Sequence, residues 1–477
     1  MPTLSADLIT AMRARLESAG LGAGTVASSA LGPAREPVHT VYGGAHLFRA
    51  ETARKLGDLA LRALEVFAPD ASAFAAALDL PGGSSGAAGA ARDTGDGAAA
   101  GSSGGAASGL HAAVYERVVA KLRREPVEDL RIDFEDGYGV RPDEEEDGHA
   151  VQAAREVARG LALGSLPGML GIRVKALTPE LCGRSLRTLD LFLSSLVAAS
   201  GGSLPEGFVV TLPKVEAPEQ VAALVEALEA LEGALGLARG AVWVEIMVET
   251  PSAVVAPDGS MAVRRLCSAG RGRCVAVHFG PYDYTASLGI PASQQRLSHP
   301  ACDVARGLLQ VAVAGTGIRL SDGPTNVLPV EVHRGAQGAL GEAEREENRR
   351  AVVGAWRLHA GHVRRALERG IGQGWDLHPA QLPARYGAVY AFYLEGLAVA
   401  SQRLRNFLDR AAQATRVGAV FDDAATGQGL LGFFLRGVAA GALTEEEAVR
   451  GSTLSLEELR SRSFARIVAQ RSGQPGA

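Results

Sequence analysis

Short runs of consecutive apolar residues recur along the chain, and most of them end in Gly, Pro or a charged residue. Eight runs have the length and the β-branched content of strands that are buried on both faces: Val38–Gly43, Asp129–Glu135, Leu170–Ala176, Phe208–Val215, Val242–Glu249, Cys274–Tyr282, Gly317–Asp322 and Trp375–His378. Segments with apolar residues at helical spacing separate them: Ala50–Phe67, His149–Leu163, Arg184–Ala198, Pro218–Leu235, Cys302–Ala314 and Glu344–Arg369. This α/β alternation predicts a closed (β/α)8 TIM barrel of parallel strands.

An open, doubly wound sheet is the main alternative to the barrel. Its first strand is followed by a glycine-rich phosphate turn with the pattern G-x-G-x-x-G. Here the first predicted strand leads into Tyr42-Gly43-Gly44-Ala45-His46, which does not match that pattern. The barrel is therefore the better interpretation.

Three segments are expected to lie outside the strand–helix units of the barrel, which we place at residues 38–393. Residues 1–37 form an N-terminal helical segment, with an amphipathic helix at Ala6–Ser18. Residues 81–109 consist almost entirely of Gly, Ala and Ser, and we expect a disordered surface insertion there. Residues 394–477 show only helical patterns and predict a C-terminal helical extension, which could be a lid, an oligomer contact or both.

The composition limits the range of partners. The 477 residues carry a net charge of −5 and the pI is about 6.1, which argues against nucleic acid or an anionic membrane as a partner. No apolar run reaches the roughly 18 residues that span a bilayer, and residues 1–20 lack the order of a signal peptide, so we expect a cytoplasmic protein. The four cysteines include no C-x-x-C pair, which favours reduced thiols.

Two of the predicted strands end in a carboxylate. Glu249 ends the fifth strand and Asp283 ends the sixth, and neighbouring strands lie about 4.8 Å apart. Because a charge at the tip of a buried strand is costly unless it is paired, the two acids could share one hard cation. Two carboxylates with water and substrate oxygens suit Mg2+, and Mn2+ fits equally well. The alternative is that each acid pairs with an arginine or caps a helix.

Further charged residues gather at the C-terminal strand ends, where barrel enzymes carry their active sites. Arg173 on the third strand can grip a substrate carboxylate and balance an enolate, or it can pair with Glu135 or Asp136. Those two acids end the second strand, and we expect them to accept hydrogen bonds from metal-bound water and to be candidates for the base. Their alternative role is to cap the following helix or to build its turn.

Lys214, Asp322 and His378 lie at the ends of the fourth, seventh and eighth strands, and we predict that they contact the substrate. A Schiff base on Lys214 would make the protein a metal-free aldolase. The acid pair favours a metal instead, and Lys214 could simply pair with barrel acids. His378 could orient a loop or transfer a proton.

Seven strings at the predicted strand ends resemble the HpcH/HpaI aldolase and citrate lyase β-subunit family. The resemblance covers roughly Val38 to Tyr393, and the strings follow the order found in that family. They are Asp133-Phe-Glu-Asp136, Gly171-Ile-Arg173-Val, Leu212-Pro-Lys214-Val, Val248-Glu249-Thr-Pro, Phe279-Gly-Pro-Tyr-Asp283-Tyr, Asp322-Gly-Pro and Leu377-His-Pro-Ala-Gln381.

The resemblance implies a barrel of the phosphoenolpyruvate/pyruvate type, which makes or breaks a carbon–carbon bond beside a carboxylate or thioester with Mg2+ or Mn2+. The family's metal ligands fall on Glu249 and Asp283, its substrate-binding arginine on Arg173, and its outer acids on Glu135 and Asp136. The resemblance also implies a homo-oligomer, a trimer or a hexamer, in which a C-terminal segment often closes a neighbour's site.

The first strand departs from this family. Members that use acyl-CoA begin the strand with Arg-Ser and end it with Val-Pro-Gly, whereas this chain has His39-Thr-Val-Tyr-Gly-Gly44. We therefore predict a metal-dependent carbon–carbon lyase or aldolase that acts through an enolate on a small oxo- or hydroxy-carboxylic acid, with the CoA thioester of such an acid also open. A thioester hydrolase on the same scaffold and a non-catalytic metabolite-binding barrel are the alternatives.

Overall fold

The computed structural model describes residues 36–82, 103–335, 340–416 and 424–471, with scattered positions between 7 and 15. Most of the predicted N-terminal helix and of the predicted insertion therefore lies outside the described residues. The last part of the insertion is described, and it is helical, because α5 begins at Ser103. Once the apolar residues that follow form a helix, its extension over neighbouring residues costs little.

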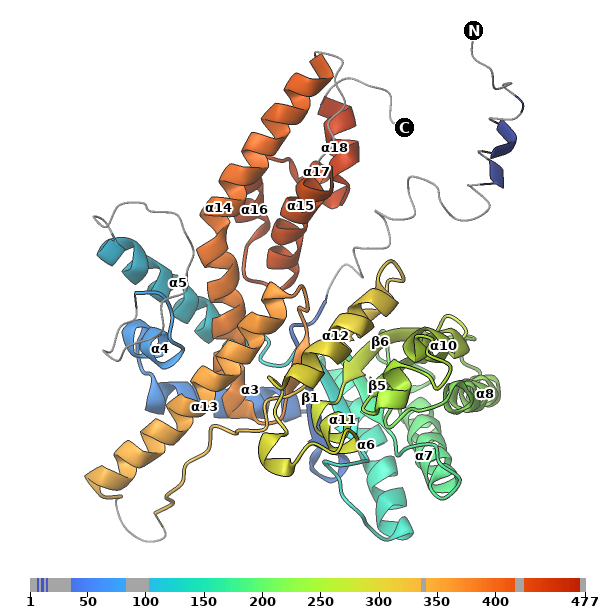
Figure 1. The fold of residues 1–477 in the computed structure, drawn as a ribbon. Coiled ribbons are helices and arrows are strands. Elements are labelled where there is room, and N and C mark those ends of the chain that lie inside the picture. The colour runs from blue at the N-terminus through green and yellow to red at the C-terminus, as the bar shows by residue number, and fades with distance from the viewer. Residues whose placement is uncertain are drawn as a thin grey trace. The chain divides into compact units, whose positions relative to one another are not determined.

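Eight parallel strands form a nearly closed barrel with helices between them, so the predicted (β/α)8 fold is confirmed (Figure 1). The strands are β1 (His39–Gly44), β2 (Asp129–Asp133), β3 (Met169–Arg173), β4 (Val209–Leu212), β5 (Trp243–Val248), β6 (Cys274–Phe279), β7 (Arg319–Ser321) and β8 (Gly374–Asp376). Consecutive strands pair from β1 to β7, and β8 pairs with β1. A parallel bridge between Ser321 and Gln373 links the end of β7 to the residue before β8.

Several strands end earlier than the apolar runs suggest. β6 ends at Phe279 rather than at Tyr282, because Pro281 has no backbone N–H for a strand ladder and instead opens the helix α11 (Pro281–Ser287). Asp283 therefore lies in the first turn of a helix. The sequence-based prediction that Asp283 ends the sixth strand was wrong. β5 ends at Val248, so Glu249 is the first residue beyond it.

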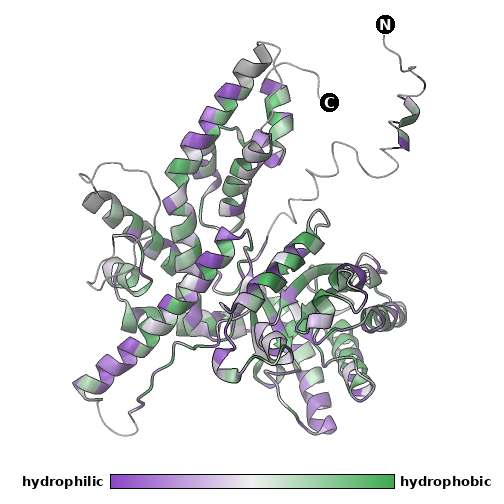
Figure 2. Cartoon of the chain, viewed as in Figure 1, coloured by the Kyte–Doolittle hydropathy of each residue, from purple (hydrophilic) through white to green (hydrophobic). Residues whose placement is uncertain are grey.

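Helices surround the barrel strands. Each helix carries both hydrophobic and hydrophilic residues, as expected of amphipathic helices (Figure 2). Those of the barrel are α3 (Thr52–Phe67), α4 (Ala71–Ala77), α5 (Ser103–Arg124), α6 (Asp143–Leu163), α7 (Cys182–Ser200), α8 (Pro218–Leu235), α9 (Pro251–Val254), α10 (Ala262–Ala269), α11 (Pro281–Ser287), α12 (Pro300–Val313) and α13 (Glu342–Glu368), with the 3-10 turns η1 (Ala45–Leu47), η2 (Ala292–Gln294) and η3 (Pro379–Gln381). All six predicted helices are present. The short helices α4, α9, α10 and α11 were not predicted, because a few residues show no clear period.

The barrel interior carries paired charges below its mouth. Arg131 on β2 is 1% exposed, and its Nη2 donates to Glu245 on β5 at 2.8 Å. Its Nε donates to the hydroxyl of Thr211 on β4 at 3.1 Å, and the same guanidinium forms an ion pair with Asp129. Because each charge has partners on other strands, this layer fixes how the strands of the barrel face one another.

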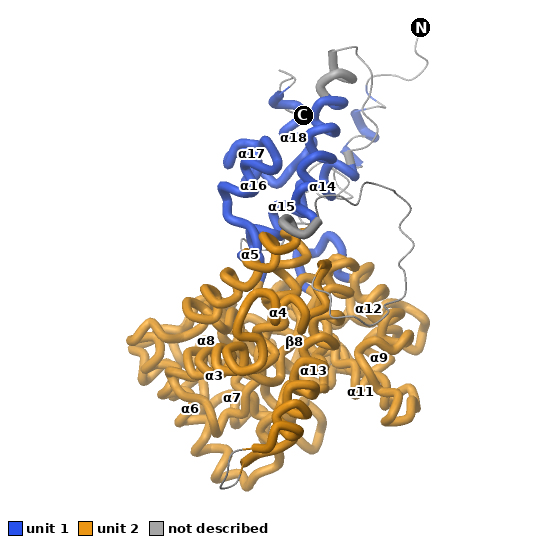
Figure 3. The backbone as a smooth tube through the Cα atoms, turned by 90° about the vertical axis from the view of Figure 1, so that its left-hand side faces the viewer, with its two compact units in different colours: residues 1–36, 313–319, 396–477 blue, residues 37–312, 320–395 orange. Residues whose placement is uncertain are grey.

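The chain divides into two compact units (Figure 3). One contains residues 37–312 and 320–395, and the other contains residues 1–36, 313–319 and 396–477. The helices after the barrel are α14 (Leu382–Arg416), α15 (Ala424–Ala439), α16 (Glu445–Ser452), α17 (Leu456–Arg460) and α18 (Phe464–Arg471). The domain boundaries and the role of these helices stay predictions. Within the described parts of the chain, we find no helix that combines the length and the apolar character needed to cross a membrane.

Asp303 links two helices of the barrel. Its carboxylate, on α12, forms ion pairs with Arg306 of the same helix and with Arg365 and Arg369, at the end of α13. Burial alone would raise the pKa of Asp303, but hydrogen bonds from Arg369 and Arg306 outweigh it and hold that pKa well below the usual range. Because Arg365 and Arg369 are partly exposed, their ion pairs with Asp303 are screened by solvent.

We expect Asp303→Asn to lower the free energy of unfolding by about 1–2 kcal/mol at pH 7. A carboxylate with a depressed pKa stabilises the fold above its unfolded pKa of about 4, and this contribution is lost as the pH falls towards the folded pKa. Urea unfolding at pH 7 and at pH 3 measures the difference, which should shrink at pH 3. Asp58→Asn, an exposed position on α3, is the control and should change neither value. An equal loss at both pH values would contradict the assignment.

Candidate active site

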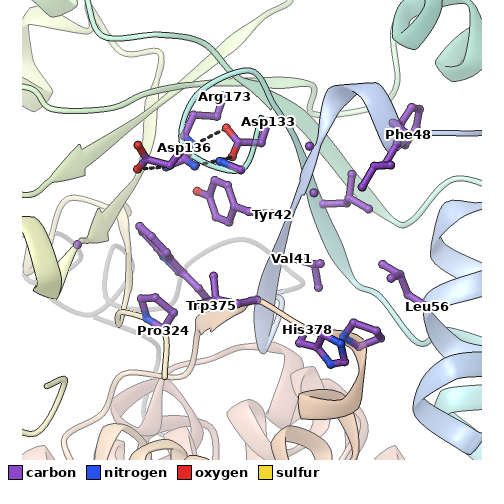
Figure 4. A pocket seen from close by; sticks show the side chains of 18 of the residues that line it. Val41, Tyr42, Phe48, Leu56, Asp133, Asp136, Arg173, Pro324, Trp375 and His378 are labelled. Atoms are coloured by element: carbon purple, nitrogen blue, oxygen red, sulfur yellow. Dashed lines mark hydrogen bonds and ion pairs between the residues drawn. The ribbon is translucent and has the colours of Figure 1, made fainter. Parts of the chain in front are cut away.

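A cavity of about 600 Å³ opens where the barrel strands end at their C-terminal side (Figure 4). Its walls come from the ends of β1, β2, β3 and β8 and from the turns that follow β5, β6 and β7. Five of the eight predicted site residues line it: Asp136, Arg173, Glu249, Asp283 and His378. The position of the cavity agrees with that of the active site in barrel enzymes.

Arg173, at the end of β3, is held by a carboxylate that sequence reasoning did not single out. Its Nε and Nη2 donate to the two oxygens of Asp133 at 2.7 and 2.5 Å, which is the fork geometry of a strong ion pair. Asp133 also accepts from the backbone N–H groups of Glu135 (2.9 Å) and Gly137 (2.7 Å). Asp133 is fully buried and Arg173 is 5% exposed. Nη1 forms an ion pair with Glu135 at 3.1 Å and lies 3.7 Å from Asp136, so each nitrogen of the guanidinium has an acidic partner.

Two aromatic rings pack beside this ion pair. The guanidinium carbon of Arg173 lies 4.9 Å from the centre of the Tyr42 ring, in a cation–π contact, and the Tyr42 ring lies 5.0 Å from that of Trp375. The Tyr42 hydroxyl is 3.0 Å from Nδ1 of His278. Burial raises the pKa of Tyr42 well above its usual value, so the phenol stays protonated. The ring of Tyr42 and the carboxylate of Asp133 together hold Arg173 in one position.

Glu249 is a buried acid that packs closely against Gly280. It is 3% exposed, and its Oε2 accepts the backbone N–H of Lys214 at 2.9 Å. Lys214 has a left-handed φ of 50° in the turn that presents this N–H. A Cβ at Gly280 would lie 2.4 Å from Cγ of Glu249, so a larger residue there would displace the Glu249 side chain. Burial raises the pKa of Glu249 to about 7, and the charge of Asp283 adds to this effect.

Glu249 and Asp283 line the same cavity and are the two predicted ligands of a metal ion. Asp283 is exposed in the first turn of α11 and lines the same cavity. Among the described residues, no three His, Cys, Asp or Glu side chains come together as a complete metal cage. Two carboxylates still fit Mg2+, which keeps several waters and is commonly held by one or two carboxylates. A cation would also offset the cost of burying the charge of Glu249, so these residues fit the predicted ion.

Lys214 pairs with the two acids that follow β2. Its Nζ forms an ion pair with Glu135 and lies 3.2 Å from Asp136. Burial alone would lower the pKa of Lys214, but the hydrogen bond to Glu135 and the charges of both acids raise it well above its usual value. A Schiff base forms from a neutral amine, so this geometry opposes the metal-free aldolase and agrees with the pairing role. Burial also raises the pKa of Glu135.

The other two predicted contacts differ in their surroundings. Asp322 accepts from Nη1 of Arg306 at 2.8 and 3.1 Å and from the backbone N–H of Gly323 at 2.8 Å, and it does not line the cavity. His378 does line it, and its Nδ1 accepts the backbone N–H of Ala380 at 3.2 Å. Burial lowers the pKa of His378. Its neutral ring therefore carries its proton on Nε2 and can donate a hydrogen bond.

A family model described as a domain of unknown function (DUF6986) matches residues 30–467. The chain belongs to this family. The match extends through the barrel and most of the C-terminal helices, and the predicted membership of the HpcH/HpaI family stays a prediction. No curated protein matched the sequence.

Solved structures with a similar course of the chain include enzymes of two kinds. A citrate lyase from Burkholderia xenovorans LB400 is 21% identical, with 70% of this chain and 91% of that chain covered and a TM-score of 0.49. The malate synthase of Haloferax volcanii, as a lead(II) complex, is 17% identical, with 75% and 92% covered and a TM-score of 0.42. The protein CitE of Mycobacterium tuberculosis, in complex with magnesium and acetate, is 19% identical, with 58% and 87% covered and a TM-score of 0.34. At these values the similarities carry no argument about the site.

The residues that sequence reasoning missed each had a signal. Arg131 and Asp133 are two positions apart on β2, and alternate residues of a strand face the same side. Asp133 could therefore have been placed in the barrel mouth beside Arg173. Tyr42 stands directly before the glycine pair that ends β1. The sequence places Tyr42 near a strand end. Its contacts with residues on β3 and β6 could not be predicted, because only the closed barrel brings these strands near β1.

Proposed function

We propose that the protein is a metal-dependent carbon–carbon lyase or aldolase that acts on a small oxo- or hydroxy-carboxylic acid through an enolate. The observation that supports this proposal most strongly is the buried carboxylate of Glu249, which faces the same cavity as Asp283 and Arg173. This combination provides two ligands for a cation and one guanidinium for an anion. Among the residues that the structure describes, no serine, cysteine or lysine lines this cavity.

Each residue has a role in this proposal. Glu249 and Asp283 would hold Mg2+ or Mn2+, which supplies a Lewis acid for substrate oxygens. Nη1 of Arg173 exchanges its ion pair with Glu135 for the substrate carboxylate, and the guanidinium stabilises the negative charge of the enolate. Because Asp133 and Tyr42 fix the guanidinium before substrate binds, little reorganisation is needed at this step.

The bond cleavage requires a base. When a 4-hydroxy-2-oxo acid is cleaved between C3 and C4, the hydroxyl proton goes to the base, the hydroxyl oxygen forms an aldehyde or ketone carbonyl, and the electrons of the broken carbon–carbon bond move into the enolate of pyruvate. Asp136 lies on the cavity wall, and Glu135 beside it has a raised pKa. These two acids can accept the proton directly or through a water molecule. Lys214 holds them in place by its ion pairs, and the Nε2–H of His378 is available to orient a substrate oxygen.

The proposal is tested by exchange of the methyl protons of pyruvate in deuterated buffer, followed by proton NMR. We expect exchange with Mg2+ or Mn2+ and none with EDTA, because enolate formation needs the cation. The same measurement with acetyl-CoA distinguishes a free acid from a thioester as the substrate. Exchange of neither compound, with the protein folded and the metal present, would contradict the proposal. Release of CoA without exchange would favour the thioester hydrolase.

A further inference from the structure

The cavity has two parts that differ in polarity and lie on the two sides of β1. One part, inside the barrel mouth, contains the charged residues described above. The other lies between β1, β2 and α3, and its walls are apolar: Val41, Leu47, Phe48, Leu56, Leu130 and Leu377. Figure 4 shows Tyr42 and Arg173 on one side of β1, and Val41 and Leu56 on the other.

The alternation of side chains along β1 produces this division. Thr40 and Tyr42 face the barrel interior, where their hydroxyls contact Asp129 and His278. Val41, between them, faces outward to α3. By the same alternation, position 43 faces outward, towards the apolar part. A small acid would fill only the charged part of a cavity of about 600 Å³, so the apolar part has room for a further group.

Gly43 leaves the passage between the two parts open. A Cβ built at Gly43 would meet no atom within 4 Å, and its φ is outside the left-handed region, so a side chain could be accommodated there without backbone strain. Gly44 is different, because a Cβ there would lie 2.5 Å from the carbonyl oxygen of Gly137. The glycine at 44 is needed for packing, whereas packing does not require the glycine at 43.

We propose that the substrate carries an alkyl chain, which passes over Gly43 into the apolar compartment formed by the six residues named above while its carboxylate binds at Arg173. This inference rests on the proposed function and specifies its substrate as a hydroxy or oxo acid with an apolar side chain of several carbons. Among the described residues that line the cavity, every Asp, Glu, Lys or Arg belongs to the part inside the barrel mouth, so the apolar part offers no cationic side chain for a second carboxylate or a phosphate.

The test is a chain-length series of 2-oxo acids, from pyruvate to 2-oxohexanoate, titrated by calorimetry with Mg2+ present. We expect the affinity to rise about threefold to fourfold for each methylene that enters the compartment. In Gly43→Val the added side chain blocks the passage, and in Leu56→Gln a polar amide enters the compartment. Both variants should lose the dependence on chain length. Leu59→Gln is the matched control on the same helix, since Leu59 is 46% exposed, and it should behave as the wild type.

The outcomes separate this inference from the proposed function. Metal-dependent binding of pyruvate with no gain from longer chains would overturn the alkyl compartment and leave the proposed function standing. If no oxo acid binds, 1-hexanol is titrated without metal. Binding of hexanol to the wild type and to Leu59→Gln, but not to Gly43→Val, would support the compartment while contradicting the proposed function. Failure of hexanol as well would overturn the compartment. Thermal melting shows whether each variant is folded.

Discussion

Glu249→Gln is expected to abolish the Mg2+-dependent exchange of pyruvate methyl protons while leaving the fold intact. A Lewis acid contributes several kcal/mol to the stabilisation of an enolate, so loss of a ligand should reduce the rate by about a thousandfold or more. The amide oxygen of Gln can still accept the backbone N–H of Lys214, which Glu249 accepts at 2.9 Å. Because burial penalises the charged form of Glu249, the metal-free variant should be at least as stable as the wild type above pH 7.

The pH dependence of Mg2+ binding gives a second test of Glu249 as a metal ligand. Burial raises the pKa of Glu249 to about 7, so below that pH a cation has to displace a proton. The Kd of the wild type for Mg2+ should therefore increase about tenfold for each pH unit below 7. Asp283→Asn should weaken binding but keep this dependence, whereas Glu206→Gln, in an exposed turn, should change nothing. Metal-dependent exchange that survives in Glu249→Gln would rule out Glu249 as a ligand.

The barrel could be predicted because its signals are local and repeated. A strand that is buried on both faces appears in the sequence as a continuous apolar run. The run Val242–Glu249 extends beyond β5 by only one residue at each end. The predicted helix Pro218–Leu235 matches α8 at both ends, since a proline begins it and a glycine follows it. The prediction fails where a helix-starting residue lies within an apolar run. The run into Tyr282 is apolar, but Pro281 ends the strand and starts a helix.

The candidate site was predicted less completely, because pairing depends on distance across the barrel. The sequence shows three acids between positions 133 and 136 and one arginine at position 173, but not which acid meets the arginine. The alternation of side chains along β2 points Asp133 into the barrel, where its carboxylate pairs with the guanidinium of Arg173. Asp136 lies 3.7 Å from the same guanidinium and is 61% exposed. The environment of Glu249 is likewise non-local, since Lys214 and Gly280 approach it from two different turns.

The ion pair at the end of β2 leads to the second large effect. We expect Asp133→Ala to lower the free energy of unfolding by about 3–5 kcal/mol, because it leaves the buried guanidinium of Arg173 without its main partner. The backbone N–H groups of Glu135 and Gly137 also lose their acceptor. Urea unfolding followed by circular dichroism measures the loss. Asp136→Ala, three residues further along the same turn, is the control, and it should cost no more than about 1 kcal/mol because that acid is exposed.

A double variant separates the two causes of this loss. Arg173→Met removes the buried charge, so Asp133→Ala combined with Arg173→Met should be more stable than Asp133→Ala alone. If the double variant is no more stable, the lost stability comes from the two backbone N–H groups of the turn rather than from the unpaired guanidinium. Asp133→Asn then serves as the complementary measurement. Its amide oxygen can accept from one of those N–H groups, so its loss should be smaller than that of Asp133→Ala, and binding of pyruvate should still weaken because Arg173 is no longer held by a charged fork.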